Sequence, residues 1–111
     1  MGRAEKLRKE LRKGVYAMAI LAVVKAEGPI HGYGIRKRLA EAGLEPAEST
    51  LYEALKALEK AGALKSFWGE AGGRVRKYYE VTEDGEELLN SLVIEYSRVR
   101  KALEVLGIGQ R

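Results

Sequence analysis

The sequence predicts one mainly α domain, an α+β fold in which three helices precede a β-hairpin and one long helix follows it. Apolar residues recur at steps of three or four over most of the chain, which is typical of helices with one buried face. Only between residues 64 and 81 does the pattern change to alternation, which is typical of strands. The length of 111 residues leaves room for a single domain with a modest core.

The first helix is expected over residues 4–27, before Gly28 and the helix-breaking Pro29. Gly14 marks either a bend in this helix or a later start just after it. One apolar stripe is predicted to face the core, made of Leu7, Leu11, Val15, Met18 and Ala22.

The next two helices are expected over residues 32–42 and 48–61, each closed by a glycine, Gly43 and Gly62. His31 is predicted to be a turn residue that starts the second helix. Inward positions are Ile35 and Leu39 on the second helix and, on the third, Leu51, Ala54, Leu55 and Leu58.

A hairpin is expected from strands over residues 64–68 and 74–81, joined by a flexible turn over residues 69–73 that contains three glycines. Phe67 and Trp68 are neighbours on the first strand, so one should face the core and the other the surface. A partly buried Trp68 is expected, rather than one that stacks on a ligand.

The last helix should begin after Thr82, whose side chain is well placed to cap it. Its apolar residues follow coiled-coil spacing over nearly three heptads, which favours a homodimer. The alternative is a helix that covers only its own domain. The predicted dimer interface consists of Leu89, Leu92, Tyr96, Val99, Leu103 and Leu106.

This order of elements predicts a winged helix-turn-helix with a two-stranded β wing and a long C-terminal dimerisation helix. Residues 1–82 would form the winged unit, including the N-terminal helix, and residues 83–111 the dimerisation helix. In this architecture the third helix enters the DNA major groove, and the wing reaches the flanking phosphates or the minor groove.

The charge pattern agrees with a polyanionic partner. The net charge is +4, and residues 1–13 hold six basic and two acidic side chains. On charge alone a solvated, frayed N-terminus is an equal reading. The candidate DNA-binding residues are Ser49, Thr50, Tyr52, Glu53, Lys56 and Lys60 on the third helix, Arg36 and Lys37 on the second, and Arg74, Arg76 and Lys77 on the wing.

Several classes of protein are excluded or disfavoured. The chain has no cysteine, which excludes disulfides, zinc fingers and thiol catalysis, and its one histidine has no neighbouring ligand cluster. No nucleophile–base pair or metal-ligand spacing is evident, so we expect no enzyme, cofactor or metal. The longest apolar run, residues 15–24, is about half of what a membrane span needs, which favours a cytoplasmic protein without a signal peptide.

Four stretches resemble the PadR-like transcriptional regulators: GPIHGYGI at residues 28–35, STLYEAL at 49–55, LEKAGAL at 58–64 and RKYYEVTEDG at 76–85. The resemblance implies a homodimer, held by its terminal helices, that binds operator DNA and often represses neighbouring genes. In some relatives a small aromatic or hydrophobic effector binds near the dimer interface. Two positions depart from the family pattern, because Ser49 replaces a usual glycine and Ala47 a usual serine.

Two hypotheses follow. The first is a repressor whose two-fold symmetry requires a pseudopalindromic operator in double-stranded DNA. The second is a winged helix that serves as a protein–protein or RNA-binding module. Modules of the second kind commonly lack charge on the third helix and the wing, whereas this chain has Lys56, Lys60, Arg74, Arg76 and Lys77 there.

Overall fold

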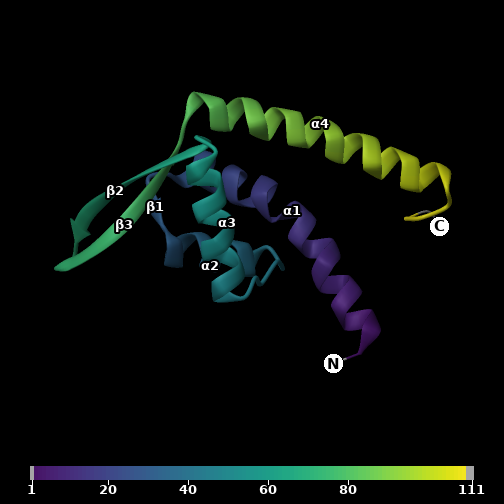
Figure 1. Ribbon diagram of the computed structural model, residues 1–111, viewed down its shortest axis with the longest axis horizontal. Helices are drawn as coiled ribbons and strands as arrows, with labels where there is room; N and C mark the ends of the chain where they lie inside the picture. The colour runs from purple at the N-terminus through teal and green to yellow at the C-terminus, as the bar shows by residue number, and fades with distance from the viewer. Residues whose placement is uncertain (1, 110–111) are drawn as a thin grey trace.

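The computed structural model describes residues 2–109; residues 1, 110 and 111, at the outer ends of the two expected domains, lie outside this range. Its helices and three-stranded sheet confirm the mainly helical class and the predicted order (Figure 1). The elements are α1 (Arg3–Glu27), β1 (Ile30–His31), α2 (Gly32–Glu41), α3 (Glu48–Lys60), β2 (Leu64–Ala71), β3 (Arg74–Val81) and α4 (Glu83–Val105).

The core lies where the C-terminal half of α1, the inner faces of α2 and α3, and the base of the sheet meet. The predicted inner face of α3 is confirmed, since Leu51, Leu55 and Leu58 are buried. Removing these side chains from water is the main force that fixes α3, with its opposite face outward.

The sheet has the order β1-β3-β2, with antiparallel pairs throughout. Strand β1 was not predicted, because two residues are too few to show an alternating pattern. Its residues Ile30 and His31 pair with Tyr79 and Tyr78. His31 does start α2, as predicted: its Nδ1 accepts a hydrogen bond from the Gly34 amide at 3.0 Å.

The wing formed by β2 and β3 is longer than expected, and the predicted five-residue turn is wrong. Strand pairing continues to Ala71 and Arg74, so the turn consists of Gly72 and Gly73 alone. Both have positive φ angles, +60° and +79°, which is the backbone that a two-residue hairpin of this kind requires. The wing is therefore an ordered ribbon almost to its tip.

The expectation for Phe67 and Trp68 is also wrong, because neither side chain is buried. Phe67 is 42% exposed and Trp68 is 71% exposed. The reason is the length of the wing: at these positions it has passed beyond the core, so nothing covers either face. Phe67 stacks on Tyr78 of the neighbouring strand, with ring centroids 5.8 Å apart.

Helix α1 is continuous through Gly14 and is helical from Arg3, so the basic N-terminal segment is not frayed. Its predicted inner stripe is wrong at the N-terminal end, where Leu7 and Leu11 are exposed, and at Ala22, which is also exposed. This half of α1 extends past the body of the protein (Figure 1). The residues of α1 that enter the core are Tyr16, Ile20, Leu21 and Val24.

Helix α4 starts inside the core and ends outside it. The Thr82 hydroxyl accepts from the Gly85 amide, confirming the predicted cap, and donates to the carbonyls of Gly62 and Ala63. Leu89 is buried in its own domain and Leu92 is half-buried against the same core, so the boundary expected at residue 82 crosses a packed contact. The rest of the predicted interface is exposed: Tyr96, Val99, Leu103 and Leu106.

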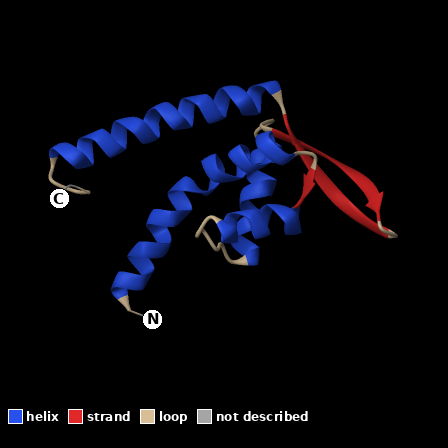
Figure 2. Cartoon of the chain, turned by 180° about the vertical axis from the view of Figure 1, so that it is seen from behind, coloured by secondary structure: helices blue, strands red, loops and turns tan. Residues whose placement is uncertain are grey.

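The two long helices make the molecule elongated. Figure 2 shows the N-terminal half of α1 and the C-terminal half of α4 extending to one side of the body, opposite the wing. The radius of gyration is 15.5 Å, whereas a compact domain of this length would have about 13 Å. We call these two segments, residues 3–14 of α1 and residues 93–105 of α4 with its C-cap Leu106, the helical arms.

Candidate nucleic-acid interface

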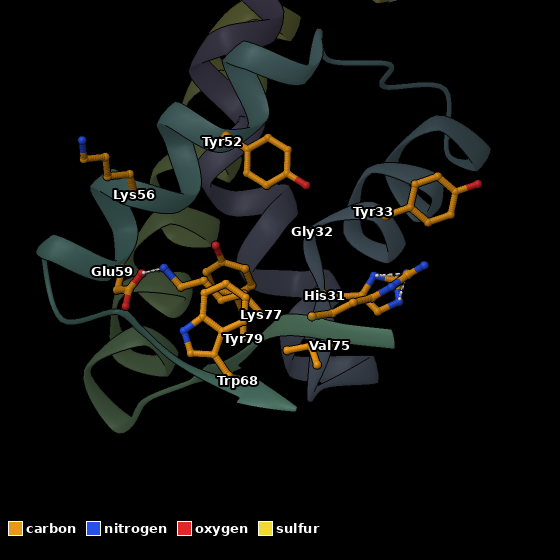
Figure 3. A pocket seen from close by; sticks show the side chains of 11 residues that line it. His31, Gly32, Tyr33, Tyr52, Lys56, Glu59, Trp68, Val75, Lys77 and Tyr79 are labelled. Carbon is orange, nitrogen blue, oxygen red and sulfur yellow. Dashed lines mark hydrogen bonds and ion pairs between the residues drawn. The ribbon is translucent and has the colours of Figure 1, made fainter. Parts of the chain in front are cut away.

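A groove of about 700 Å³ opens between α3, the start of α2 and the wing (Figure 3). Aromatic and cationic side chains dominate its lining. We call it the α3–wing groove. Its lining residues are His31, Gly32, Tyr33, Tyr52, Lys56, Glu59, Trp68, Val75, Arg76, Lys77 and Tyr79.

The outer face of α3 carries the residues expected there. All of them are exposed except Thr50, which is half-buried: Ser49, Tyr52, Glu53, Lys56 and Lys60. The departure from the family pattern at Ala47 has a structural consequence, because Ala47 is the N-cap of α3 and provides no side-chain hydrogen bond. The first amides of α3 therefore have no capping partner from this residue.

Tyr52 is held at the centre of the groove by its contact with Gly32. A Cβ atom built on Gly32 would lie 2.6 Å from the Tyr52 hydroxyl oxygen and 2.8 Å from the ring. Only glycine leaves room for the ring at this distance, so the glycine of α2 and the tyrosine of α3 form a matched pair. Tyr52 is 45% exposed, which leaves its other side open to a ligand.

Lys77 is tied to the base of the wing. Its Nζ lies 3.4 Å from Glu59 Oε1, and the other oxygen of Glu59 accepts a hydrogen bond from the Ser66 hydroxyl. This hydrogen bond, together with the charge of Lys77, lowers the pKa of Glu59. The ion pair joins the wing to α3, and a phosphate would compete with Glu59 for Lys77.

Arg76 approaches the start of α2. Its Nη1 lies 2.9 Å from Nε2 of His31, and its guanidinium carbon lies 5.9 Å from the centre of the Tyr33 ring. Burial lowers the pKa of His31, and the positive charge of Arg76 lowers it further. His31 is therefore neutral near pH 7, and the Arg76 guanidinium lies against its ring at the edge of the groove.

The remaining candidate residues lie outside this groove. Arg36 donates from Nε to the Pro46 carbonyl at 3.2 Å and lies 3.9 Å from Glu48. Lys37 is exposed and lines a smaller cavity on α2 with Tyr33 and Ala40. Arg74 is exposed near the wing tip, and Ser49, Thr50, Glu53 and Lys60 lie on α3 away from the groove lining.

The structure thus brings together four of the predicted residues, Tyr52, Lys56, Arg76 and Lys77. Sequence reasoning missed the role of their neighbours, because single exposed or charged residues give no signal until the chain folds. The missed lining residues are His31, Gly32, Tyr33, Glu59, Trp68, Val75 and Tyr79.

Other kinds of site are not evident over residues 2–109. No group of three or more histidine, aspartate or glutamate side chains in that range is placed to hold a metal ion. Within the same range, no helix is both long enough and apolar enough to cross a membrane.

These features define a winged-helix DNA-binding protein. They are α3 with its exposed outer face, which corresponds to the recognition helix, the wing, and the cationic groove between the two. Comparison with known proteins gives the family. The model of the transcriptional regulator PadR-like family matches residues 20–91, well over half of the chain. The chain belongs to this family, whose members are DNA-binding transcriptional regulators, which is not a class of enzymes.

Solved structures agree with this assignment. A PadR family transcriptional regulator from Eggerthella lenta is 29% identical, with a TM-score of 0.84 over 96% of this chain and 94% of that one. A Streptococcus mutans protein is 35% identical, with a TM-score of 0.77 over 89% and 92% of the two chains. A PadR-like transcriptional regulator from Bacillus cereus is 25% identical, with a TM-score of 0.80 over 91% and 99%.

Proposed function

We propose that this protein is a homodimeric repressor that binds a pseudopalindromic operator, with α3 in the major groove and the wing on the flanking backbone. The observation that carries the proposal is the α3–wing groove, where Lys56 and Arg76 lie beside the exposed Tyr52. Cations at this position contact phosphates, while the short polar side chains at the start of α3 reach base edges.

The helical arms support the dimer. Their exposed apolar residues form a surface that one protomer leaves uncovered, and a second copy would cover it across a two-fold axis. This surface includes Leu7, Leu11, Tyr96, Val99, Leu103 and Leu106. Leu89 and Leu92 act differently, because their contacts within the core anchor α4 to the winged unit.

Repression follows from occupancy, since a dimer on a promoter excludes other proteins from the same DNA. Release of the operator by a small aromatic or hydrophobic effector near the dimer interface stays a prediction from the family resemblance. The charge of the groove disfavours the alternative of a protein–protein module, although Glu59 neutralises part of it through Lys77.

A gel shift with the DNA upstream of the protein's own gene, titrated with salt, tests the proposal. We expect a discrete complex whose association constant falls steeply as salt rises, because bound cations release counterions from the duplex. A protein that shifts neither this fragment nor other duplexes at low salt would contradict it.

A further inference from the structure

Trp68 is the single tryptophan of the chain and one of its most exposed large side chains. It projects from β2 beyond the core and lies directly across from Lys77 on β3. Figure 3 shows it beside Lys77 and Tyr79, at the rim of the α3–wing groove. Leaving so large an apolar surface in water is unfavourable, and exposed aromatics of this kind often mark a binding surface.

A second apolar side chain extends this surface. Val75 is 64% exposed and lines the same groove. It shares a face of the wing with Lys77, because strand residues two apart point the same way. The apolar rim is therefore continuous along the inner face of the wing, the face turned toward α3.

Cations flank this apolar rim. Lys56 on α3 and Arg76 on β3 line the groove with Trp68, and among residues 2–109 no carboxylate lies within ion-pair distance of either. Among the described residues Glu59 is the one carboxylate in the groove lining, and it is paired with Lys77. A ligand for this groove must therefore offer negative charge and apolar surface within a few ångströms of each other.

A sugar–phosphate strand has this alternation, because each phosphate is followed by the largely apolar face of a deoxyribose. Resting on the function proposed above, we infer that the α3–wing groove seats one backbone strand of the DNA duplex. Lys56 contacts a phosphate on the α3 side of the groove, and Trp68 packs its indole ring on the neighbouring deoxyribose. Arg76, which points to the other face of β3 and lies against His31, contacts a further phosphate from that side. Trp68 thus adds affinity that depends little on salt to contacts that depend strongly on it.

Because Trp68 is the single tryptophan, its fluorescence reports the contact directly. The probe is a mixed-sequence DNA duplex at low salt, since a backbone contact needs no particular sequence. Duplex binding is followed separately, by the anisotropy of a dye on the DNA. We expect saturating duplex to reduce quenching of Trp68 by acrylamide at least about twofold, with binding seen at the same concentrations by both readouts.

Variants separate the roles of the side chains. Trp68→Ala should weaken duplex binding by about five- to tenfold, equivalent to the loss of one good apolar contact, with the salt slope unchanged. Trp68→Phe, which keeps an aromatic ring, should restore most of the affinity. The matched control is Ile94→Ala, which removes an exposed apolar side chain from α4, away from the wing, and should bind as the wild type does.

The outcomes are distinguishable. If the duplex binds while acrylamide still reaches Trp68, and Trp68→Ala binds as the wild type does, the inference is overturned and the proposed function stands. If Trp68 becomes protected without DNA as protein concentration rises, a second copy of the chain occupies the rim, which also overturns it. If the wild type binds no duplex at low salt, both the inference and the proposed function fail.

Discussion

The winged unit and the helical arms differ in how completely one protomer buries its apolar residues. In the winged unit the inner faces of α2 and α3 are covered, and Ile35 and Leu55 are fully buried. On the arms, Leu11 of α1 and Leu106 of α4 remain about three-quarters exposed, at 77% and 76%. The arms and the segments α2 and α3 are all regular helix, so the difference in burial lies in packing and not in secondary structure.

This comparison separates two kinds of residue. The exposed residues that line the α3–wing groove are mainly aromatic and cationic, so their substitution should change ligand binding and leave the fold intact. The exposed apolar residues that form the proposed dimer surface on the arms lie outside the α3–wing groove, so their substitution should change assembly. The predictions below test whether the two surfaces act separately in this way.

The largest effect is expected from Val99→Glu on α4. In the proposed dimer the change buries one unpaired carboxylate per protomer, which should cost several kcal/mol of dimer stability. Val99 is a sharper choice than Leu92, because Leu92 is half-buried against the core of its own protomer. Sedimentation at micromolar concentration should show a wild-type dimer and a monomeric variant that no longer shifts the upstream DNA.

The control for this prediction is Ser97→Glu, which adds the same charge to an exposed position on the other side of α4. It should remain dimeric and bind DNA. A wild type that sediments as a monomer, or a Val99→Glu variant that stays dimeric and still binds, would remove the role assigned to the helical arms.

A smaller effect, limited to DNA binding and leaving the fold and the dimer unchanged, is expected from the double variant Lys56→Ala and Arg76→Ala. Each lost phosphate contact should reduce the slope of log association constant against log salt by about one. Gel shifts at several salt concentrations measure this slope, and circular dichroism should show unchanged helix content. An unchanged slope and an unchanged affinity, with normal helicity, would show that the α3–wing groove takes no part in DNA binding.

An effect of the opposite sign is expected from Glu59→Gln. The change removes the carboxylate paired with Lys77, so Lys77 becomes free to contact a phosphate. Duplex binding should strengthen at low salt, with a slope steeper by about one. Stability should fall by no more than about 1 kcal/mol, because the pair is partly exposed. A weaker complex would show that the ion pair positions the wing for binding and that Lys77 makes no phosphate contact.

The smallest effect concerns pH. Because the pKa of His31 is lowered in the folded protein, the unfolded state binds protons more readily. The stability that neutral His31 contributes is present above its unfolded pKa of about 6.5 and is lost as pH falls through the folded value. Denaturant unfolding at fixed protein concentration should show this loss as pH falls below about 6.5, and His31→Asn, which keeps a capping acceptor, should not. Equal pH dependence in both proteins would exclude His31 as its source.

The sequence was sufficient to predict those elements that depend on local patterns. The glycine ends of α2 and α3, the Thr82 cap and the buried face at Leu51, Leu55 and Leu58 all follow from spacing within one helix or turn. Strand β1 depends instead on pairing with β3, in which Ile30 lies opposite Tyr79, 49 positions later in the sequence. The two residues of β1 carry no pattern of their own.

The errors at Trp68 and Leu11 have a common cause. Both assignments assumed that an apolar residue in a regular element faces the core of its own chain. The wing and α1 both extend past that core. The length of each extension depends on where the other elements pack, which local sequence patterns do not show. The groove was likewise only half predicted: its cations follow from charge spacing, whereas the Tyr52–Gly32 and Arg76–His31 contacts join separate elements.

Hydroxyl-radical footprinting on the DNA upstream of the gene tests the central claim most directly, that two winged units held together by their helical arms bind one operator. We expect two protected backbone segments related by two-fold symmetry and spaced by about 10 bp or a multiple of it. In the Val99→Glu variant, both segments should lose their protection together. A single protected segment, unaffected by Val99→Glu, would contradict the account, because one winged unit alone would then be sufficient to bind.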